Sequence, residues 1–256
     1  MAKQKALRIL GVRIDDVTTK ETLETFDAWI AEGTPHQVVT VNPEFVMRAQ
    51  QDREFAVVLE EASLALPDGQ GLLHASQVMG RPLRERVTGS DTLPLVAKRA
   101  SSRGYRLFLL GAGPGVAERA AQKLTNDCPG LQIAGTYAGS PDPTEDAVIV
   151  ARIKSAHPDV LFVAYGAPQQ DLWINRNLEN LGVPVCMGIG GAFDFVAGVT
   201  RRAPVWMRRL GVEWLYRLLQ EPWRWRRMLA LPRFVLAVLR ERLSGNRRRS
   251  TCVESR

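Results

Sequence analysis

Short apolar runs alternate with amphipathic segments through residues 7–200 of the chain. The apolar runs predict strands at residues 7–14, 37–41, 64–67, 105–110, 131–134, 160–165 and 183–187. Between them, apolar residues spaced three or four apart predict helices, for example at residues 18–31, 52–62 and 116–124. Strands that alternate with helices are typical of an α/β fold, in which helices cover both faces of a largely parallel sheet.

The pattern changes near residue 201. Residues 201–256 hold 15 Arg, no Lys and 4 Glu, a net charge of +11, whereas residues 1–200 carry a net charge of −4. We therefore predict an α/β core at 1–200, a basic C-terminal helical appendage at 201–246 and a disordered tail at 247–256. So basic a segment favours anionic partners: nucleic acid, anionic lipid or a phosphorylated substrate.

The appendage combines this charge with aromatic residues. Trp206, Leu210, Trp214 and Leu218 follow at i, i+4 spacing and predict one apolar stripe. A basic amphipathic helix bordered by Trp is typical of a helix that lies at a membrane surface, so we expect membrane association. The alternative is a helical hairpin that packs on the core and exposes a solvated basic face.

The remaining composition points to the cytoplasm. No run approaches the roughly 18 apolar residues that a membrane span needs, and the start of the chain lacks the apolar core of a signal peptide. The three cysteines, Cys128, Cys186 and Cys252, have no metal-ligand or redox spacing, so we expect reduced thiols. With the basic appendage, this predicts a cytoplasmic protein held peripherally at the inner face of the cell membrane.

One acidic residue stands at a strand–helix junction. The apolar run 64–67 ends at Pro67, Asp68 and Gly69 follow, and a helical pattern begins near Leu72. Gly69 and Gly71 would let a ligand or another backbone approach closely. We interpret Asp68 as a candidate general base, with helix capping as the alternative.

Polar residues also end the preceding strand. Thr40 and Asn42 lie at the C-terminal end of the run 37–41, where open α/β sheets bind ligands. Pro43 can open the next helix, so capping by Asn42 remains an alternative. Further along, the stretch from Arg86 to Asp91 places Ser90 at a helix start, which predicts an anion site with Arg86 beside it.

A glycine-rich turn follows the strand at 105–110. Gly111, Gly113 and Gly115 open a helix, as in Rossmann-like folds, and predict a phosphate-binding or nucleotide-binding loop. The dinucleotide fingerprint would need its third glycine at Val116 and an acid after residues 131–134, and neither is present. A nucleotide-dependent oxidoreductase or methyltransferase that uses residues 111–115 is nevertheless a second hypothesis.

Seven stretches together resemble the WecG/TagA/CpsF family of bacterial glycosyltransferases. They are 40–43 (TVNP), 67–71 (PDGQG), 86–91 (RVTGSD), 109–115 (LLGAGPG), 166–171 (GAPQQD), 188–194 (GIGGAFD) and 211–222 (GVEWLYRLLQEP). They keep the family's order over about residues 7–230. The usual Lys-Gln-Glu after Gly-Ala-Pro is Gln169-Gln170-Asp171 here, which leaves Gln170 in place.

The resemblance implies an inverting, metal-independent hexosyltransferase without a cofactor. It would move a sugar, typically N-acetylmannosamine or its uronic acid, from UDP to a polyprenyl-diphosphate-linked amino sugar in cell-surface polysaccharide or teichoic acid biosynthesis. By position, Asp68 resembles the catalytic base, and Thr40, Asn42 and Gln170 resemble residues of the sugar pocket.

The resemblance also implies a function for the C-terminal appendage. Arg217, Arg224 and Arg227 match arginines thought to close over the site and bind diphosphate. In the family this segment meets the membrane and competes with self-association of the core, so a homo-oligomer is expected as well. We expect no nucleic acid partner, although a nucleic-acid-binding module that uses the basic appendage is a third hypothesis.

Overall fold

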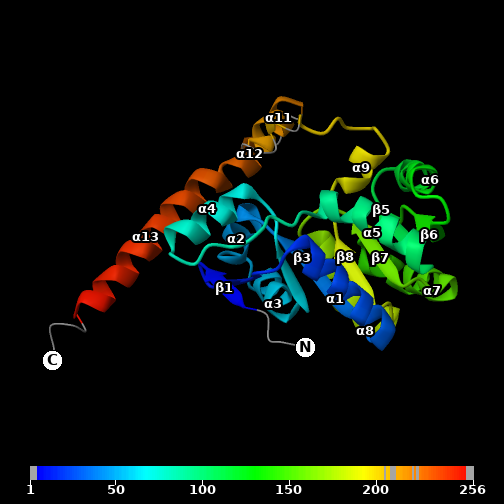
Figure 1. Cartoon of the computed structure of the whole chain (residues 1–256), viewed down its shortest axis with the longest axis horizontal. Helices are drawn as coiled ribbons and strands as arrows, with labels where there is room; N and C mark the ends of the chain where they lie inside the picture. Colours follow the sequence, from blue (N-terminus) through cyan, green and yellow to red (C-terminus); the bar gives the residue numbers. More distant parts are fainter. Residues whose placement is uncertain (1–4, 205, 208–211, 221, 223–224, 252–256) are drawn as a thin grey trace.

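A parallel sheet forms the centre of the protein (Figure 1). The computed structural model describes residues 5–204, 206–207, 212–220, 222 and 225–251. The sheet has six strands in the order β4-β3-β8-β7-β5-β6, and every neighbouring pair is parallel. The strands are β3 (His36–Val41), β4 (Leu64–Pro67), β5 (Arg106–Gly111), β6 (Gln132–Tyr137), β7 (Val160–Ala164) and β8 (Val185–Gly188).

Helices cover both faces of this sheet. One face packs against α1 (Thr19–Glu32), α5 (Gly89–Arg103), α6 (Val116–Asp127) and α9 (Ala192–Val196). The other face packs against α3 (Arg53–Glu61), α7 (Asp146–Ala156) and α8 (Gln169–Leu181), with α2 (Pro43–Ala49), α4 (Gln70–Val78) and the short 3-10 helix η1 (Pro143–Glu145) nearby. The predicted α/β fold is confirmed.

The strands are apolar throughout because both of their faces are covered. In β7, Phe162 packs with the α1, α5 and α6 side of the core, whereas Leu161 and Val163 pack with the α7 and α8 side. All three side chains are fully buried. A continuous apolar run is what such a strand requires, which is why the sequence pattern located the sheet strands well.

The predicted strand at residues 7–14 is wrong as a single element. The structure forms an antiparallel hairpin of β1 (Ala6–Ile9) and β2 (Val12–Asp15), separate from the main sheet. Leu10 and Gly11 form its turn with φ of 50° and 82°. This left-handed backbone reverses the chain in two residues, as hairpin turns do. Gly11 was the sequence signal for this turn, but Leu10 beside it is apolar and rarely adopts a positive φ, so residues 7–14 read as one apolar run.

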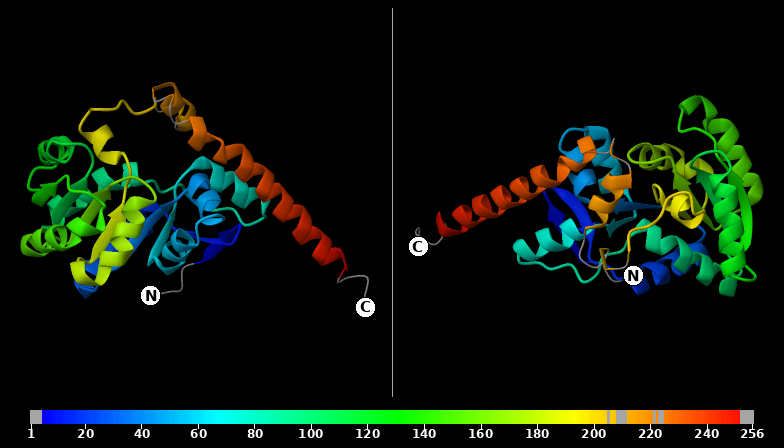
Figure 2. Two further views of the ribbon diagram at one scale, coloured as in Figure 1. Left: turned by 180° about the vertical axis from the view of Figure 1, so that it is seen from behind. Right: turned by 90° about the horizontal axis from the view of Figure 1, so that it is seen from above.

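The C-terminal part extends along the outside of the core (Figures 1 and 2). Its described helices are α11 (Glu213–Gln220), α12 (Trp225–Met228) and α13 (Ala230–Thr251). Helix α13 packs on α2 and α4 through Phe234 and Val238, which are buried, and its far end projects from the core. Among the described residues, no helix has the length and apolar character to cross a bilayer.

Candidate active site

A cavity of about 310 Å³ opens where β4, β3, β8 and β7 end. It lies at the carboxyl edge of the sheet, where open α/β sheets bind ligands. Six predicted site residues line it: Thr40, Asn42, Asp68, Arg86, Ser90 and Gln170. These residues span more than a hundred positions of the chain, and the sheet brings them to one place.

Asp68 and Asn42 follow neighbouring strands. Thr40 of β3 pairs with Leu66 of β4 in parallel register, so the next polar residue of each strand emerges at the same level. Helix α4 begins at Gln70 after Gly69, and no side chain caps it with a hydrogen bond. Asp68 is therefore not the cap residue of α4, and its half-buried side chain lines the cavity.

Two glycines shape the turn around Asp68. Gly69 has a φ of 115°, a conformation that side chains with a Cβ rarely adopt. A Cβ added to Gly71 would lie 2.7 Å from the Cγ of Pro43, so the starts of α4 and α2 are in close contact. The glycines thus pack the two strand-end turns against each other and hold Asp68 beside Asn42.

Asn42 both caps a helix and lines the cavity. Its Oδ1 accepts a hydrogen bond of 3.0 Å from the amide of Phe45, which starts α2. The capping alternative is therefore correct, and it does not exclude a role in binding. The Nδ2 amide can donate and Oδ1 has a second lone pair, so the side chain of Asn42 can still bind a ligand.

Gln170 is buried and held against the end of β8. Its Oε1 accepts a hydrogen bond of 2.9 Å from the amide of Gly190. A Cβ added to Gly188 would lie 2.6 Å from the Nε2 of Gln170. On the adjacent strand, the hydroxyl of Thr40 donates to the carbonyl oxygen of Gly188 at 3.3 Å. These contacts form the floor of the cavity from β3, β8 and α8.

Asp171 lies behind this floor. Its side chain is fully buried, and within the described part of the chain neither carboxyl oxygen has a hydrogen bond of good geometry. Burial raises the pKa of Asp171 to about 8, and the amide of Gln170 offsets this only in part. The carboxyl group is therefore largely protonated at neutral pH.

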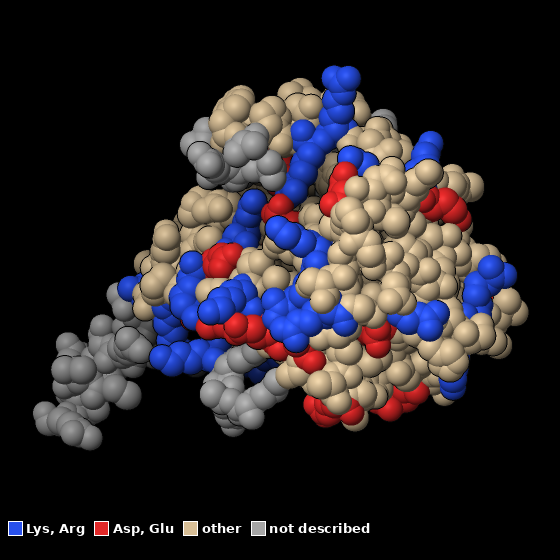
Figure 3. Space-filling model, turned by 45° about the vertical axis from the view of Figure 1, so that its right-hand side comes forward, with Lys and Arg blue, Asp and Glu red and all other residues tan. Residues whose placement is uncertain are grey.

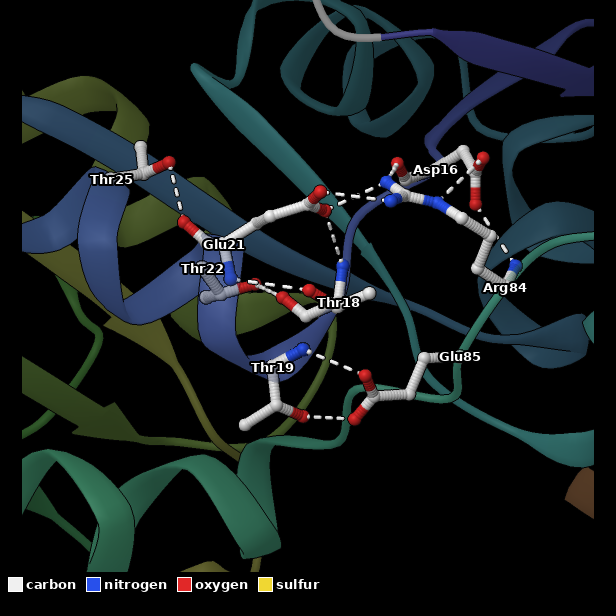
Figure 4. Close-up of polar contacts among 8 residues, drawn as sticks. All are labelled: Asp16, Thr18, Thr19, Glu21, Thr22, Thr25, Arg84 and Glu85. Atoms are coloured by element: carbon white, nitrogen blue, oxygen red, sulfur yellow. Dashed lines mark hydrogen bonds and ion pairs between the residues drawn. The ribbon is translucent and has the colours of Figure 1, made fainter.

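The loop that carries Arg86 is pinned to the start of α1 (Figure 4). Arg84 donates to both carboxylate oxygens of Glu21, at 2.8 and 2.7 Å, and to Asp16. Glu85 accepts from the amide of Thr19 at 3.1 Å. Two consecutive residues thus anchor the loop immediately before Arg86, which fixes where that guanidinium enters the cavity wall.

Four charged groups meet at the cavity wall. Arg202 donates to Asp91 at 2.7 Å, and Glu213 of α11 lies 3.5 Å from Arg202 and 3.9 Å from Arg86. Burial alone would raise the pKa of Asp91, but hydrogen bonds from Arg202 and Thr88 outweigh it and hold that pKa below its usual value. These ion pairs connect the core to the C-terminal segment.

Other predicted site residues lie elsewhere. Gly111, the last residue of β5, and Gly113 in the turn after it do not line the cavity, because β5 is one position beyond β7 in the sheet. Gly111 instead approaches the backbone of Ala164, and a Cβ there would lie 2.8 Å from the carbonyl carbon. Arg224 lies outside the described residues, as do the side chains of Arg217 and Arg227.

The structure adds cavity residues that the sequence did not assign to the site. Arg202, Glu213 and Trp214 line the cavity, together with Met228 and Leu231. Two features of the sequence could have indicated these residues. Arg202 entered the prediction only through the net charge of residues 201–256, and the motif at 211–222 was used only to assign Arg217.

In the described ranges, no group of three or more His, Cys, Asp or Glu is placed to hold a metal ion.

Comparisons with known proteins agree with the resemblance. The model of the glycosyl transferase WecG/TagA/CpsF family matches residues 7–248. An N-acetylglucosaminyldiphosphoundecaprenol N-acetyl-beta-D-mannosaminyltransferase of Bacillus subtilis is 38% identical over 205 residues, 80% of this chain and 79% of the relative. The enzyme of that name from Staphylococcus aureus is 33% identical over 232 residues, 90% of this chain and 91% of the relative.

Proposed function

The chain belongs to the WecG/TagA/CpsF family of glycosyl transferases, and from this premise we propose its substrates. It transfers N-acetylmannosamine, or a related hexose or uronic acid, from a UDP-sugar to an amino sugar linked to polyprenyl diphosphate. The relatives' names support the acceptor, a diphosphoundecaprenol that carries N-acetylglucosamine, and the transferred mannosaminyl group.

One observation carries this proposal. Asp68, Asn42, Thr40 and Gln170, which come from two strand ends and a helix, all line one cavity. A carboxylate surrounded by amide and hydroxyl groups suits a sugar, whose hydroxyls donate and accept hydrogen bonds. The neighbouring Arg86 suits a phosphate.

In the mechanism we propose, Asp68 acts as the general base. It accepts the proton of an acceptor hydroxyl, which attacks the anomeric carbon while the bond from that carbon to the UDP oxygen breaks. A single displacement inverts the configuration at the anomeric carbon, so an α-linked donor yields a β-linked product. The relatives' names give the transferred group as beta-D-mannosaminyl. General-base assistance of this kind is typically worth about 10²–10⁴-fold in rate.

The departing UDP then needs positive charge. Arg86 lines the cavity, and the resemblance adds Arg217, Arg224 and Arg227 from the C-terminal segment. Guanidinium groups bind phosphate oxygens in pairs and keep their charge at every physiological pH. We propose that they take the role a divalent metal has in many sugar-nucleotide enzymes. An activity that persists in EDTA would support this, and loss of activity restored by Mg²⁺ would refute it.

The acceptor lipid requires contact with a membrane, and we propose that the C-terminal segment provides it. Exposed large apolar side chains gather there: Trp206, Trp214, Leu215, Leu219, Trp225, Leu229, Val235, Leu236, Leu239 and Leu243. In α13, Val235, Leu239 and Leu243 form one exposed stripe, beside the exposed Arg240 and Arg242. Lys and Arg side chains also cross the centre of the face in Figure 3, with acidic ones between them. Exposed apolar and basic groups together favour an anionic lipid surface.

The decisive experiment incubates the protein with a short-chain polyprenyl-diphosphate-linked N-acetylglucosamine and a panel of UDP-sugars, and detects products by mass spectrometry. A product heavier by one N-acetylhexosamine residue, from UDP-N-acetylmannosamine, is the expected result. No product with any UDP-sugar would refute the proposal. Flotation with anionic vesicles tests the membrane step, and salt-dependent binding to DNA instead would favour a nucleic acid partner.

The oxidoreductase or methyltransferase hypothesis is tested separately. Thermal unfolding with UDP, NAD or S-adenosylmethionine measures which ligand the folded chain binds, because a ligand that binds only the folded state raises Tm. We expect stabilisation by UDP alone. Stabilisation by NAD or S-adenosylmethionine without UDP would reverse the order of the hypotheses.

A further inference from the structure

Two arginines from distant parts of the chain share one carboxylate at the cavity wall. Arg86 follows the loop pinned to α1, and Arg202 follows α9; both side chains are about one-fifth exposed. Glu213, at the first turn of α11, lies 3.9 Å from Arg86 and 3.5 Å from Arg202. The paired guanidinium groups therefore already hold an anion that the protein itself supplies.

The carboxylate of Glu213 makes only long contacts with the two guanidinium groups. Neither distance is that of a good charge-assisted hydrogen bond, which is about 2.7–2.9 Å. The Nε of Arg202, which lies 3.5 Å from Glu213, is buried and makes no hydrogen bond of good geometry with the described residues. A buried donor without an acceptor is costly, so the site is suited to an anion that carries more oxygen atoms than a carboxylate.

The local charges also fit an exchange of anions. Asp91 pairs with Arg202 from the other side at 2.7 Å, so the two arginines and two carboxylates sum to zero. From these four groups alone, a diphosphate would meet no net charge while Glu213 stays in place. Once Glu213 leaves, the remaining three groups carry one positive charge, and both guanidinium groups face the ligand.

We infer that Arg86 and Arg202 form a binding site for a diphosphate group, which Glu213 occupies until the ligand displaces it. The inference deepens the proposed function, because both the donor nucleotide and the acceptor lipid carry a diphosphate. It makes Glu213 an internal competitor of the ligand. Displacement of Glu213 also breaks its ion pairs with Arg86 and Arg202, which connect α11 to the core. Ligand binding would therefore change how the C-terminal segment is held.

The test is calorimetric titration of the full-length protein with UDP, with uridine and with a soluble short-chain prenyl diphosphate. Glu213→Gln keeps the shape of the side chain and removes the competing charge. A partly buried ion pair of this kind is worth at most about 1 kcal/mol, so the variant should bind a diphosphate about threefold to fivefold more tightly. Arg202→Gln should weaken that binding, and Arg202→Lys should restore only part of it.

Controls separate this effect from general charge. Glu241→Gln removes a carboxylate of α13 that accepts from the amide of Leu10, outside the cavity, and should leave every affinity unchanged. Uridine, which lacks phosphate, should bind all variants alike. The diphosphate whose affinity responds to Glu213→Gln identifies the source, nucleotide or lipid.

The opposite result is equally clear. If Glu213→Gln weakens or does not change the binding of both diphosphates, the carboxylate is a structural link and the inference is wrong. A structure with inorganic pyrophosphate gives a second measure: an oxygen within hydrogen-bond distance of the Arg202 Nε supports the inference, and an unmoved Glu213 overturns it. These readouts need no sugar transfer, so failure of the proposed transfer would be recognised separately.

Discussion

The main-chain amide of Asp68 donates a hydrogen bond of 2.7 Å to the carbonyl oxygen of Val41. This bond extends the pairing of β3 and β4 by one residue beyond the last paired positions, Val41 and Pro67. It therefore fixes the backbone of Asp68 next to Asn42, on a turn that two glycines keep tight. A carboxylate held in this way needs little reorganisation before it accepts a proton, which is the condition for efficient general-base catalysis.

Replacing Asp68 with Asn should abolish most turnover but preserve donor binding. The amide has the size of the carboxylate and cannot accept the proton, so kcat should fall by about 10²–10⁴-fold. The affinity for UDP, measured by titration, should change little. Asp127→Asn, at the surface end of α6, is the matched control and should behave like the wild type. Near wild-type turnover in Asp68→Asn would remove Asp68 from the mechanism.

Gly188→Ala should displace Gln170. The new Cβ would lie 2.6 Å from the Nε2 of Gln170 and 2.7 Å from the Oδ1 of Asp171, and both side chains are buried with little room to move. Overpacking of this kind typically costs about 1–3 kcal/mol. We expect a lower Tm, and a higher KM for the donor because Gln170 loses its bond to Gly190. An unchanged KM would show that Gln170 does not contact the donor.

Gly113→Ala provides the comparison for Gly188→Ala. The atom nearest to the added Cβ is Cγ2 of Val116 at 3.5 Å, an ordinary contact, so stability should be retained. Since Gly113 does not line the cavity, we expect an unchanged KM for the donor. A raised KM at wild-type stability would instead show that the turn at residues 111–115 holds part of the nucleotide, as its glycine pattern predicted.

Asp171 should make stability fall as pH rises. The pKa of its carboxyl group is raised from 3.8 to about 8 in the folded protein, so between these values the folded chain binds more protons than the unfolded chain. The free energy of unfolding must then decrease with increasing pH across that window. Asp171→Asn, which mimics the neutral acid, should remove this contribution, and the Tm of the variant should exceed that of the wild type increasingly toward pH 8. Parallel Tm curves would show that Asp171 is ionised throughout.

The ion pair of Arg84 and Glu21 should act in the opposite direction. Hydrogen bonds from Arg84 and from the amide of Thr18 lower the pKa of Glu21 from 4.5 to about 2. Its stabilisation is therefore complete above pH 4.5 and is lost as the pH falls toward 2. Arg84→Gln should weaken this acid dependence, although solvent screens the half-exposed pair and keeps the effect modest.

The control for this prediction is Arg48→Gln, which removes an arginine that pairs with Asp52 across the turn between α2 and α3. Acid unfolding followed by circular dichroism compares the three proteins. A wild-type acid profile in Arg84→Gln would contradict the assigned cause of the Glu21 shift.

The layers of the core and most of the polar residues of the candidate site could be predicted from the amino-acid sequence. The apolar run at β7 and the amphipathic pattern of α6 state locally which side chains must be buried, since strands with two covered faces need apolar residues throughout. A polar residue directly after such a strand, as in Asp68 or Asn42, must lie at the edge of the sheet. That inference needs no knowledge of strand order.

Which strand ends lie next to one another became known only from the folded protein. The order β4-β3-β8-β7-β5-β6 brings Gln170 to Asn42 and leaves Gly113 outside the cavity, although the glycine pattern of Gly113 is the more conspicuous in sequence. The packing of the C-terminal segment on the core also brings Arg202 and Glu213 next to Arg86, more than a hundred residues away in the chain. The physical reason is that periodicity reports burial, which is local, whereas strand order and ion pairs between distant segments depend on how all the layers pack together.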